Sequence, residues 1–593
     1  MANLTDVITP EIAGSLPGLF AERVKRSSEA IAYRAYSKPK ALWVDYTWAD
    51  MSERVDKVRA GLLAEGLQQG DCIALLMSNR PEWVVFEQAA LGAGLVVIPL
   101  YPNDRSENIS YILKDANVKL LIIEADEHCK TLKSIRTQLE NLKRIILLEQ
   151  SNESFSNMSQ YEQWHASVTG STTAEKLNGD TVATIVYTSG TTGRPKGVML
   201  SHNNILYNAY ACSQCTGFYP TDNFLSFLPL SHMFERTAGY YLPLMTGATV
   251  TYARSIDQLS EDLLEIKPTI FVTVPRIFER VHKKITTQLK EKSPVAQYLF
   301  HKTIDIGWHF FRYQQNKASW HPKLLFHPLL QIIVAKKITR KLGGKLRLAI
   351  SGGAPLSIEV GKTFIALGLT ITQGYGMTEL SPVVSTNLLH DNEPDSVGQA
   401  LFNVQVKLGE HDELCVKGPS VMLGYLHNKQ ATKKCIDEEG WLHTGDIAKI
   451  IDSHIYITGR IKEILVLSNG EKIPPADIEM AISNETLIEQ VLVVGEGKPF
   501  LSAICVLNED VWKDLSTQHN FDSQNCAAAH DFVKALIKKQ LLSFPGYANI
   551  YGVHTTLEPW TIDNGLITPT LKLKRKYILD KYHAEVEALY EGH

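Results

Sequence analysis

The sequence predicts an α/β protein: a large N-terminal domain of parallel or mixed sheets joined by crossover helices, followed by a smaller, mobile α+β C-terminal domain. Two observations lead to this expectation. Short apolar runs alternate with segments of helical periodicity along most of the chain, and after about Gly459 the pattern changes to short strands with intervening helices. At 593 residues the chain is long enough to bury more than one core.

The N-terminal strands are expected where short apolar runs are separated by helical segments. These runs are residues 72–77, 96–100, 119–123, 144–148, 270–274 and 346–350. Strands separated by helices pair in parallel through crossover connections, and ligands of such sheets bind at the carboxyl ends of the strands. We therefore place an N-terminal domain at residues 1–458 and expect its ligand at that edge of the sheets.

A β-branched, apolar run at residues 181–186 leads into the segment 187–197, Tyr-Thr-Ser-Gly-Thr-Thr-Gly-Arg-Pro-Lys-Gly. Its glycines allow the backbone to approach an anion closely, and its N–H groups and hydroxyls can surround phosphate oxygens. The residues expected to do so are Thr188, Ser189, Gly190, Thr191, Thr192, Gly193 and Lys196. The common P-loop needs a hydroxyl directly after its lysine, whereas Gly197 follows Lys196. We interpret the segment as a polyphosphate-binding loop of another kind rather than an ordinary surface loop.

The C-terminal domain is expected at residues 463–593, after a hinge at residues 459–462. Short apolar runs at 463–467, 490–494 and 501–507, with helical segments between them, are typical of a compact α+β unit. The chain shows no internal repeat and no low-complexity tract.

A basic, aromatic segment at about residues 281–345 stands apart from the rest of the N-terminal domain. Lysines and arginines are frequent in it, its acids are Glu291 and Asp305, and its aromatic residues include Trp308 and Trp320. Such a mixture at helical spacing can lie on an anionic membrane surface. It is equally typical of a solvated helical insertion whose aromatic side chains pack on the main domain. The sequence leaves both interpretations open.

Composition and charge exclude several classes of protein. A net charge of −4 gives no reason to expect a nucleic-acid partner, and 44% hydrophobic residues suit a globular protein. The cysteines are scattered, and the lone pair Cys212 and Cys215 is weak evidence for zinc, so free thiols in a reducing compartment are expected. Neither a signal peptide nor an uncharged apolar stretch of about 18 residues is found. We expect a cytoplasmic protein, with the inner face of a membrane as the peripheral alternative.

Several motifs together resemble those of the adenylate-forming superfamily, which includes acyl-CoA synthetases, luciferases and peptide-synthetase adenylation domains. Besides the loop at 187–197 they are Gln-Gly-Tyr-Gly-Met-Thr-Glu at 373–379, Gly-Trp-Leu-His-Thr-Gly-Asp at 440–446, Gly-Arg-Ile-Lys at 459–462 and a lysine-rich motif at 564–575. They occur in the family's order over nearly the whole chain. The resemblance implies the family's two-domain fold and the use of ATP, Mg²⁺ and CoA.

The resemblance also implies a nucleotide site. Tyr375 would stack on adenine, Thr378 would contact the α-phosphate, and Asp446 and Arg460 would bind the ribose. The other residues assigned to this site are Gly352, Gly353, Ala354, Gln373, Gly374, Gly376, Lys462 and Lys572. A buried ion pair between Asp446 and Arg460 is the simpler interpretation of those two residues, and it is compatible with sugar binding.

The residues expected to carry the chemistry are Thr188, Lys196, His232, Glu379 and Lys572. Glu379 and Thr188 offer the oxygen ligands that Mg²⁺ prefers. By resemblance Lys572 reaches from the small domain to the carboxylate and the α-phosphate. Leu571 stands before it where the family usually has glycine, and Lys574 is its rival.

Two further segments resemble the long-chain acyl-CoA synthetase group. Leu-Pro-Leu-Ser-His-Met-Phe-Glu-Arg at 228–236 resembles the group's gate motif, and the amino-acid sequence of the tail at 560–575 resembles that of the same group. The match implies that His232 stands between acyl chain and adenylate, although a lone histidine is more often structural. Lys462 falls at the family's hinge, where one domain orientation makes acyl-AMP and another opens a path for the thiol.

These resemblances imply a long-chain fatty acid–CoA ligase that forms acyl-AMP and pyrophosphate and then transfers the acyl group to CoA. One alternative is a fatty acyl-AMP ligase that loads a carrier protein; such ligases carry an insertion after the hinge, for which residues 459–473 leave no room. The other is a non-catalytic, membrane-associated lipid-binding protein. The expected partners are fatty acid, ATP and CoA and no nucleic acid, while a homodimer and the acyl length stay open.

Overall fold

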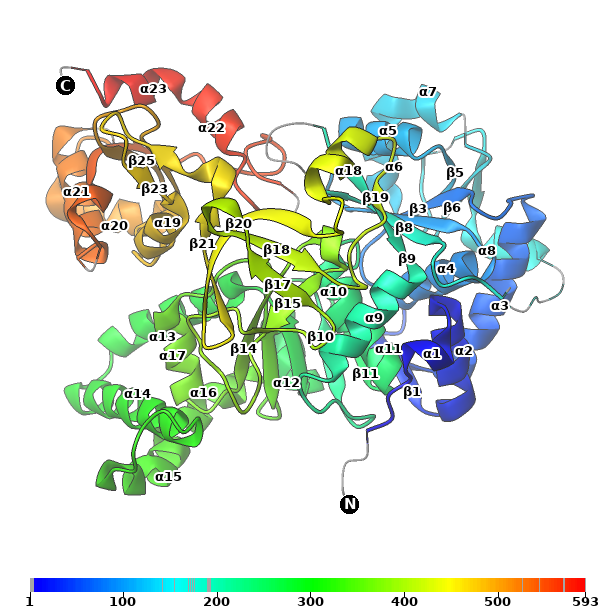
Figure 1. Ribbon diagram of the computed structural model, residues 1–593, viewed down its shortest axis with the longest axis horizontal. Coiled ribbons are helices and arrows are strands. Elements are labelled where there is room, and N and C mark those ends of the chain that lie inside the picture. The colour runs from blue at the N-terminus through cyan, green and yellow to red at the C-terminus, as the bar shows by residue number, and fades with distance from the viewer. Residues whose placement is uncertain are drawn as a thin grey trace.

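The computed structural model describes residues 5–591 except 141, 154, 169, 171, 173, 175, 189–193, 525, 543, 569 and 570. Figure 1 shows a large N-terminal part and a smaller C-terminal part, coloured orange to red, at the upper left. The N-terminal part is built on large mixed sheets with helices on their faces. The α/β class expected from the sequence, with a smaller C-terminal domain, is thereby confirmed.

One large sheet has the strand order β19-β9-β8-β4-β3-β5-β6-β7. Its pairs from β8 through β7 are parallel, whereas β9 pairs antiparallel with β8 and β19. The strands are β3 (Cys72–Leu76), β4 (Val96–Leu100), β5 (Val118–Ile123), β6 (Arg144–Leu147), β7 (Met158–Gln160), β8 (Val182–Thr188), β9 (Lys196–Ser201) and β19 (Gly424–Tyr425). The first four of these lie within one residue of the expected bounds, because fully buried strands are marked by continuous apolar runs.

The other large sheet has the order β16-β15-β14-β13-β12-β10-β11-β1-β2. It is parallel from β14 through β1 and antiparallel at both edges. The strands are β1 (Ile31–Ser37), β2 (Leu42–Thr47), β10 (Asn223–Ser226), β11 (Thr249–Tyr252), β12 (Ile270–Thr273), β13 (Leu348–Ser351), β14 (Ile371–Gly376), β15 (Val383–Thr386) and β16 (Gln399–Ala400). The strand expected at 346–350 forms as β13, two residues later at its start.

Two of the helices that cover these sheets begin at reciprocal side-chain caps. Thr47 caps α3 (Trp48–Ala64): its hydroxyl accepts from the N–H of Asp50 at 3.1 Å, and the Asp50 carboxylate accepts from the N–H of Thr47 at 2.8 Å. Ser201 caps α9 (His202–Ser213) in the same way. Such reciprocal caps satisfy N–H groups that a helix leaves without partners. The other helices close to the sheets are α2 (Leu16–Ser27), α4 (Pro81–Gly92), α5 (Ser106–Asp115), α10 (Met233–Glu235), α11 (Leu242–Thr246), α12 (Leu259–Ile266) and α17 (Ile358–Ala366).

A charged pair lies in the core of the N-terminal part. Helix α4 is almost entirely buried, and its Glu87 forms an ion pair with Arg236, whose Nε donates to Oε1 at 2.8 Å. The hydroxyl of Tyr241 donates to the same oxygen at 2.8 Å. Both charges are fully buried, so removal of either would leave an uncompensated charge and be strongly destabilising. The pair fixes the π-helical turn Arg236–Tyr241, which follows the segment that holds His232.

Strands β17 (Gln405–Leu408), β18 (Glu413–Lys417), β20 (Leu442–Ile451) and β21 (His454–Arg460) form an antiparallel sheet that the sequence analysis does not anticipate. A 3-10 turn, Ile461–Glu463, follows β21 and leads into the C-terminal part.

The C-terminal part has a small sheet of order β24-β25-β26 and a short antiparallel pair, β22 with β23. Its elements are β22 (Leu465–Val466), β23 (Lys472–Ile473), α19 (Pro475–Ser483), β24 (Ile488–Val494), β25 (Leu501–Leu507), α20 (Glu509–His519), α21 (Ala527–Gln540), β26 (Ile550–Thr556), α22 (Arg575–Lys581) and α23 (His583–Ala588). The change of architecture falls near the expected hinge. The boundaries 1–458, 459–462 and 463–593 stay predictions.

The basic segment, which lies between β12 and β13 in the sequence, forms a group of helices at the lower left in Figure 1. Its elements are α13 (Pro275–Lys290), α14 (Pro294–Gln314), the 3-10 turn Pro322–Phe326, α15 (His327–Leu330), a π-helical turn (Gln331–Ala335), α16 (Lys336–Thr339) and the 3-10 turn Arg340–Leu342. Trp308 and Phe311 of α14 pack on the core of the N-terminal part. Among the described residues, no helix combines the length and the apolarity needed to cross a membrane.

Candidate active site

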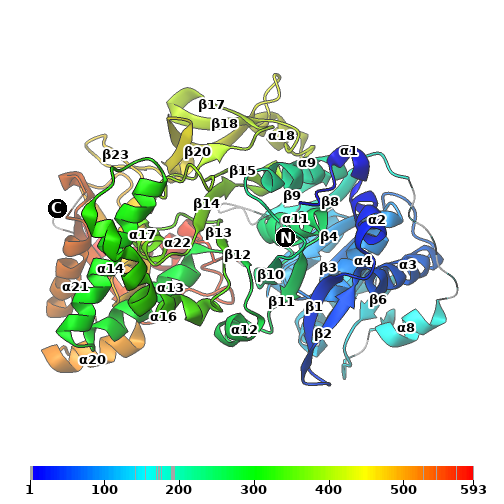
Figure 2. The ribbon, with the colours of Figure 1, turned by 90° about the horizontal axis from the view of Figure 1, so that it is seen from below.

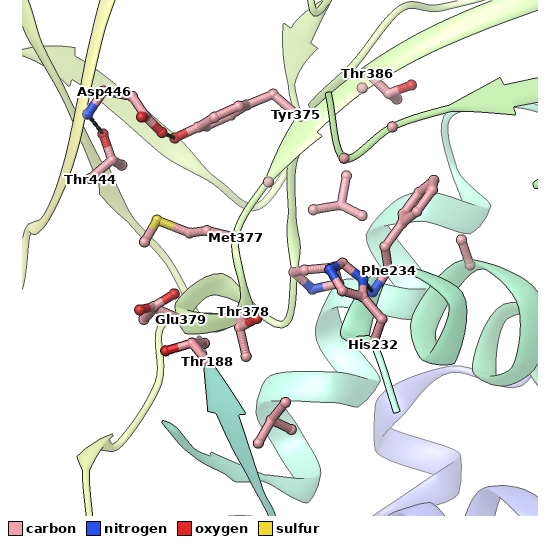
Figure 3. Close-up of a pocket in the computed structure, with 18 of the residues that line it drawn as sticks. Thr188, His232, Phe234, Tyr375, Met377, Thr378, Glu379, Thr386, Thr444 and Asp446 are labelled. Atoms are coloured by element: carbon pink, nitrogen blue, oxygen red, sulfur yellow. Dashed lines mark hydrogen bonds between the residues drawn. The ribbon is translucent and has the colours of Figure 1, made fainter. Parts of the chain in front are cut away.

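A cavity of about 430 Å³ lies where strands of the N-terminal part meet the tail of the C-terminal part. Figure 3 shows part of its wall, in which the ends of strands from different sheets face one another. The residues expected in a site that line it are Thr188, Lys196, His232, Gly352, Gly353, Gly374, Tyr375, Gly376, Thr378, Glu379, Asp446, Arg460, Lys462 and Lys572. Motifs that are far apart in the sequence therefore meet around one space.

The strand–loop–strand unit β8–β9 supplies the rim of the expected phosphate loop. Thr188 ends β8 and Lys196 begins β9, and both line the cavity. The residues between them that were assigned to phosphate, Ser189, Gly190, Thr191, Thr192 and Gly193, lie outside the described residues. The Nζ of Lys196 stands 4.8 Å from the ring centre of Tyr425, a favourable cation–π contact that orients the ammonium. Arg194 adds another cation to the wall.

Tyr375, at the end of β14, is tied to Asp446. Its hydroxyl donates to Oδ2 of Asp446 at 2.5 Å, and Nε of Arg460 donates to Oδ1 at 2.8 Å. Asp446 and Arg460 are direct partners in the β20–β21 pair, and the hydroxyl of Thr444 accepts from the N–H of Asp446 at 3.1 Å (Figure 3). Burial, together with the charge of Asp446, raises the pKa of the Tyr375 hydroxyl, which therefore remains a donor. The group presents a fixed carboxylate beside an aromatic ring.

A hydrogen-bonded cluster supports the part of β20 that carries Asp446. The carboxylate of Glu413 accepts from the N–H of Gly445 at 2.8 Å, and its other oxygen lies 2.8 Å from Nδ1 of His443. Cys415 completes a group whose donor atoms lie within 4.8 Å of one another. Because both oxygens of Glu413 have partners within the protein, the cluster fixes this part of β20.

Close backbone packing at the cavity requires glycine at two positions. A Cβ on Gly376 would lie 2.0 Å from the carbonyl oxygen of Pro382, and a Cβ on Gly352 would lie 2.8 Å from Cζ of Phe234. Either contact is closer than atoms can approach without a shift of the chain. The glycines expected from the sequence thus allow the walls to approach each other.

Two of the expected site residues are not brought to the wall. Gln373 is buried behind it, where its side chain accepts from the N–H of Leu356 at 2.7 Å and donates to the carbonyl oxygen of Pro394 at 3.1 Å. Ala354 is exposed outside the cavity. Gln373 therefore braces the turn that follows β13, whereas Ala354 makes no contribution to the cavity wall.

Glu379 and Thr188 are the oxygen donors suited to a hard cation. Both line the cavity (Figure 3), and Glu379 is buried in the 3-10 turn Thr378–Leu380. The hydroxyl of Tyr425 donates to Oε1 of Glu379 at 2.9 Å, which leaves Oε2 for another partner. A carboxylate and a hydroxyl fit the oxygen ligands that Mg²⁺ prefers. Burial, together with the charge of Glu379, raises the pKa of the Tyr425 hydroxyl, so it stays protonated and donates to the carboxylate.

His232 and Phe234 both line the cavity (Figure 3). Nδ1 of His232 accepts from the N–H of Phe234 at 3.2 Å. Burial and the nearby charge of Lys572 lower the pKa of His232 to about 4, so its ring is neutral at pH 7. The apolar part of the cavity wall, called the apolar limb below, is made up of Cys212, Cys215, Phe218, Ala238, Leu242, Leu348 and Ile350. This limb suits an apolar chain.

The tail of the C-terminal part places one of its two rival lysines at the cavity. Lys572 lines it together with Thr568, whereas Lys574 does not. Burial and the charge of Arg460 lower the pKa of Lys572. The backbone reaches this position through a tight turn, in which the N–H of Thr568 donates to the carbonyl oxygen of Lys572 at 2.9 Å and Leu571 has φ of 61°. Leucine thus occupies the left-handed conformation that favours glycine.

A latch between the two parts of the chain holds this tail. Arg105, in the loop after β4, donates through Nε to the carbonyl oxygen of Ile562 at 3.2 Å and through Nη2 to that of Asp563 at 2.6 Å. A Cβ on Gly565 would lie 2.3 Å from Nη2 of Arg105, so the guanidinium fits against bare backbone. The latch fixes the loop that precedes Lys572.

Sequence reasoning missed several residues of the wall: Tyr101, Arg194, Met377, Thr386, Asn387, Tyr425, Thr444 and Glu463. Arg194, Met377 and Thr444 lie within the recognised motifs, so the signal for them was present. Tyr425 lies outside those motifs and reaches Glu379 only because β19 pairs with β9.

Comparison with protein families supports a nucleotide-binding interpretation of the cavity. Residues 20–426 match the family described as AMP-binding enzyme, and residues 462–593 match the AMP-binding enzyme C-terminal domain. The chain is 29% identical to "Long-chain-fatty-acid--CoA ligase FadD15" of Mycobacterium bovis, over 93% of each chain. It is 32% identical to "Long-chain-fatty-acid--CoA ligase 5" of Rattus norvegicus, over 96% of this chain and 87% of the relative.

A relative with a different acceptor is also similar. The chain is 28% identical to "Long-chain-fatty-acid--[acyl-carrier-protein] ligase AEE15, chloroplastic" of Arabidopsis thaliana, over 92% of this chain and 82% of the relative. Among solved structures, the adenylation domain of a carboxylate reductase from Mycobacterium chelonae superposes with a TM-score of 0.79 at 18% identity, over 99% of this chain and 94% of that one. This last likeness supports the fold alone.

Proposed function

The chain belongs to the AMP-binding enzyme family, and from that premise we propose that it is an AMP-forming long-chain fatty acid–CoA ligase. The reaction has two halves. The fatty acid carboxylate attacks the α-phosphorus of ATP, which forms acyl-AMP and releases pyrophosphate. The thiol of CoA then attacks the acyl carbonyl, which forms acyl-CoA and releases AMP. Relatives with this activity extend over most of the chain.

The observation that carries the proposal is that cationic residues and apolar residues line one and the same cavity. Cations for phosphate and carboxylate come from three distant segments, at Lys196, Arg460 and Lys572. The same cavity is also lined by the residues of the apolar limb. A polyanion next to an alkyl chain is the combination that a fatty acyl adenylate presents, which is why we favour this substrate class over a small polar acid.

In the first half-reaction the residues bind and orient the two anions. We assign Asp446 to the ribose hydroxyls, because its oxygens are held beside Tyr375 and Arg460. Lys572 would stand between the carboxylate and the α-phosphate, where its charge offsets the negative charge that develops in the transition state. Its lowered pKa would rise again as the anions bind.

Glu379 and Thr188 would hold Mg²⁺. When bound, that ion would supply positive charge to the phosphates, as magnesium does in phosphoryl transfer. Lys196, oriented by the ring of Tyr425, would add a further charge on the phosphate side. The phosphates themselves would rest in the loop 189–193.

The neutral His232 would close the apolar limb at the carboxylate end. With Nδ1 engaged by the N–H of Phe234, its Nε2–H can donate to an acyl or phosphate oxygen. The ring of Phe234 packs on Gly352. Both groups would hold the acyl chain in line with the phosphate, which is the positioning that an in-line attack requires.

For the second half-reaction we propose that residues 463–593 turn about residues 459–462. The turn would withdraw Lys572 and admit CoA. Supporting it, the hinge segment is a short 3-10 turn with exposed Lys462 rather than a packed element, and such segments absorb the change of backbone angles in domain motions.

An acyl-AMP ligase that loads a carrier protein is the second candidate, because AEE15 is a relative of similar identity. The path from β21 through Ile461–Glu463 to β22 and β23 is direct, with no inserted element after the hinge. That continuity favours a rotating domain and CoA. We also propose peripheral contact with an anionic membrane, for which a specific surface is argued below.

The test is AMP release by the purified protein with Mg·ATP and fatty acids from short to long, with and without CoA. CoA-dependent turnover that peaks at long chains is expected. Pyrophosphate release without CoA-dependent AMP would favour the carrier-protein candidate. No turnover with any acid would overturn the proposed function.

A further inference from the structure

The helical group that follows α14 ends in an exposed apolar tip. Figure 1 shows α15 at the lower left extremity of the molecule. Large apolar side chains there face solvent: Leu325 (72% exposed), Phe326 (60%), Leu329 (55%), Ile332 (59%) and Ile333 (41%). Single exposed apolar residues are common, but a contiguous patch of this kind marks an interaction surface.

The tip is one face of an amphipathic path. From Pro322 to Leu342 the chain runs as successive helical turns, and Leu324, Leu330, Ala335 and Leu342 are its buried residues. That buried side already packs on Ile306 and Phe310 of α14. The apolar residues of the tip are therefore surplus to the requirements of the fold, since a helix with one packed face normally has polar residues on the other.

The second half of the same path is basic. Lys336, Lys337, Arg340, Lys341 and Lys345 form no ion pair with any residue between 5 and 591 that the structure describes. By contrast, the neighbouring Lys317 and Lys323 are paired with carboxylates of this chain. The unpaired charges next to an apolar tip favour a partner that is both anionic and apolar.

A hollow of about 420 Å³ lies among these cations. Lys336, Arg340, Thr339 and Gln331 line it on the side of the helical path, and Gly344, Leu346, Leu367, Gly368 and Leu369 complete its wall. Two cationic side chains and a hydroxyl give donors suited to a phosphate group, whereas Nε2 of Gln331 is already engaged by the carbonyl oxygen of Ala366 and by His327. The hollow adjoins the tip through Gln331, which belongs to the turn that carries Ile332 and Ile333.

We propose that this face, residues 322–345, docks on an anionic lipid bilayer, with the tip among the acyl chains and a phospholipid phosphate in the hollow. The pattern of an apolar tip followed by unpaired cations matches a bilayer's apolar interior and anionic surface. A second copy of the chain would bring the same cations against each other. Lipid docking deepens, and in its purpose rests on, the proposed ligase function, because long-chain fatty acids partition into bilayers.

The face is also connected to the acyl limb. The path ends at Leu342, and Gly343 and Gly344 lead directly to β13, whose Leu348 and Ile350 line the apolar limb. A surface that sits on the membrane is thus a few residues of chain from the place where an alkyl chain would bind.

The test is flotation of the full chain with vesicles of phosphatidylcholine alone or with added phosphatidylglycerol. Binding is expected only with the anionic lipid. Lys336→Glu with Arg340→Glu should weaken it by at least about twentyfold, since each surface cation contributes roughly a factor of five. Phe326→Ser with Leu329→Ser and Ile332→Ser should abolish stable attachment. Inorganic phosphate that fails to compete would show that the lipid, not a free phosphate, is the ligand.

Matched control variants distinguish binding through this face from nonspecific binding to vesicles. Lys38→Glu with Lys40→Glu reverses two exposed charges in the turn between β1 and β2, far from α14 in Figure 2. Ile451→Ser with Leu542→Ser removes two exposed apolar residues elsewhere. Both should bind vesicles as the parent does. Equal loss in a control and its matched variant would overturn the proposal, as would no binding to anionic vesicles.

Activity distinguishes failure of docking from failure of the proposed function. Both face variants should form acyl-CoA from dissolved fatty acid at the parent rate but lose turnover of fatty acid held in vesicles. Acyl-CoA formation without vesicle binding would overturn docking and leave the ligase. Vesicle binding without acyl-CoA formation would overturn the proposed ligase function and leave the docking proposal standing. Conversion of a dimer to a monomer by the face variants, with no vesicle binding, would assign the face to self-association instead.

Discussion

The two lysines of the tail differ in what surrounds them. Lys572 shares the cavity with Glu379 and Asp446, whereas Lys574 lies outside its wall. We predict that Lys572→Ala lowers acyl-AMP formation by on the order of a hundredfold or more, because it removes a charge used in the transition state. Transfer from supplied acyl-AMP should stay largely intact. Lys574→Ala is the matched control and should retain both steps within a few fold.

Pyrophosphate release and acyl-CoA formation from synthetic acyl-AMP measure the two halves separately. Equal loss of both halves in Lys572→Ala, or a greater loss of adenylation in Lys574→Ala, would contradict the assignment of Lys572.

Leu571 strains the turn that presents Lys572. Its φ of 61° costs a leucine roughly 1–2 kcal/mol. Leu571→Gly should therefore keep adenylation at or above the parent rate, while Leu571→Val, with a β-branched side chain, should lower it by about fivefold or more. Adenylation rates of both variants provide the check. Because the leucine is partly exposed, little packing is lost in either, and a slower glycine variant would show that the leucine side chain itself is needed.

His202 makes the stability of the protein depend on pH. It is buried, its Nδ1 accepts from the N–H of Leu16 at 3.3 Å, and burial lowers its pKa to about 4. Because the pKa of this histidine is lower in the folded protein, the unfolded chain binds a proton at a higher pH than the folded protein does as the pH falls. The stability is therefore complete above about pH 6.5 and is lost as the pH falls from there toward about 4.

The loss should be on the order of 3 kcal/mol for this group. His202→Asn should flatten the fall of the urea midpoint between pH 7 and pH 4.5, whereas His390→Asn, at an exposed position, should not. A slope that is unchanged in His202→Asn would rule out this histidine as the cause.

At the scale of elements, the contact between the β4–α5 loop and the C-terminal tail is the one that bears on the reaction. The loop between β4 and α5 carries Arg105, which holds the carbonyl groups of Ile562 and Asp563. We predict that Arg105→Ala slows adenylation by roughly tenfold, the value of about one charge-assisted hydrogen bond. Thioester formation from supplied acyl-AMP should be unaffected, because in the proposed second half-reaction residues 463–593 have turned and the tail no longer lies against Arg105. Lys114→Ala, on exposed α5 surface, is the control; a parallel loss of both halves would refute the latch.

The buried parallel strands were predictable as elements because each is a continuous apolar run, as in β3 and β4. The antiparallel sheet of β17, β18, β20 and β21 was not. Strand β17 has exposed or partly exposed residues throughout, so its sequence lacks the apolar run or clean alternation on which such predictions depend. The motif at 440–446, which overlaps β20, was interpreted as part of a nucleotide site and not as a strand.

The hinge is the feature that links the whole molecule to the reaction. Lys462 is exposed in the turn Ile461–Glu463 between the two parts. Lys462→Pro would fix φ near about −65° and restrict the turn of residues 463–593. We predict that adenylation survives within a few fold while thioester formation falls by about a hundredfold. Lys462→Ala should keep both, and a proline variant active in both halves would contradict the hinge.

The sequence by itself determined the fold class, the family and the motif residues of the wall, because phosphate loops and strand-end motifs are local: Thr188, Tyr375, Thr378 and Asp446 carry their signal in their immediate neighbours. Only the tertiary structure decided which distant groups meet. It pairs Tyr425 with Glu379, sets Gln373 behind the wall, and brings Lys572 rather than Lys574 to the cavity. These choices depend on strand pairing and on the approach of the tail, which no short stretch of sequence encodes.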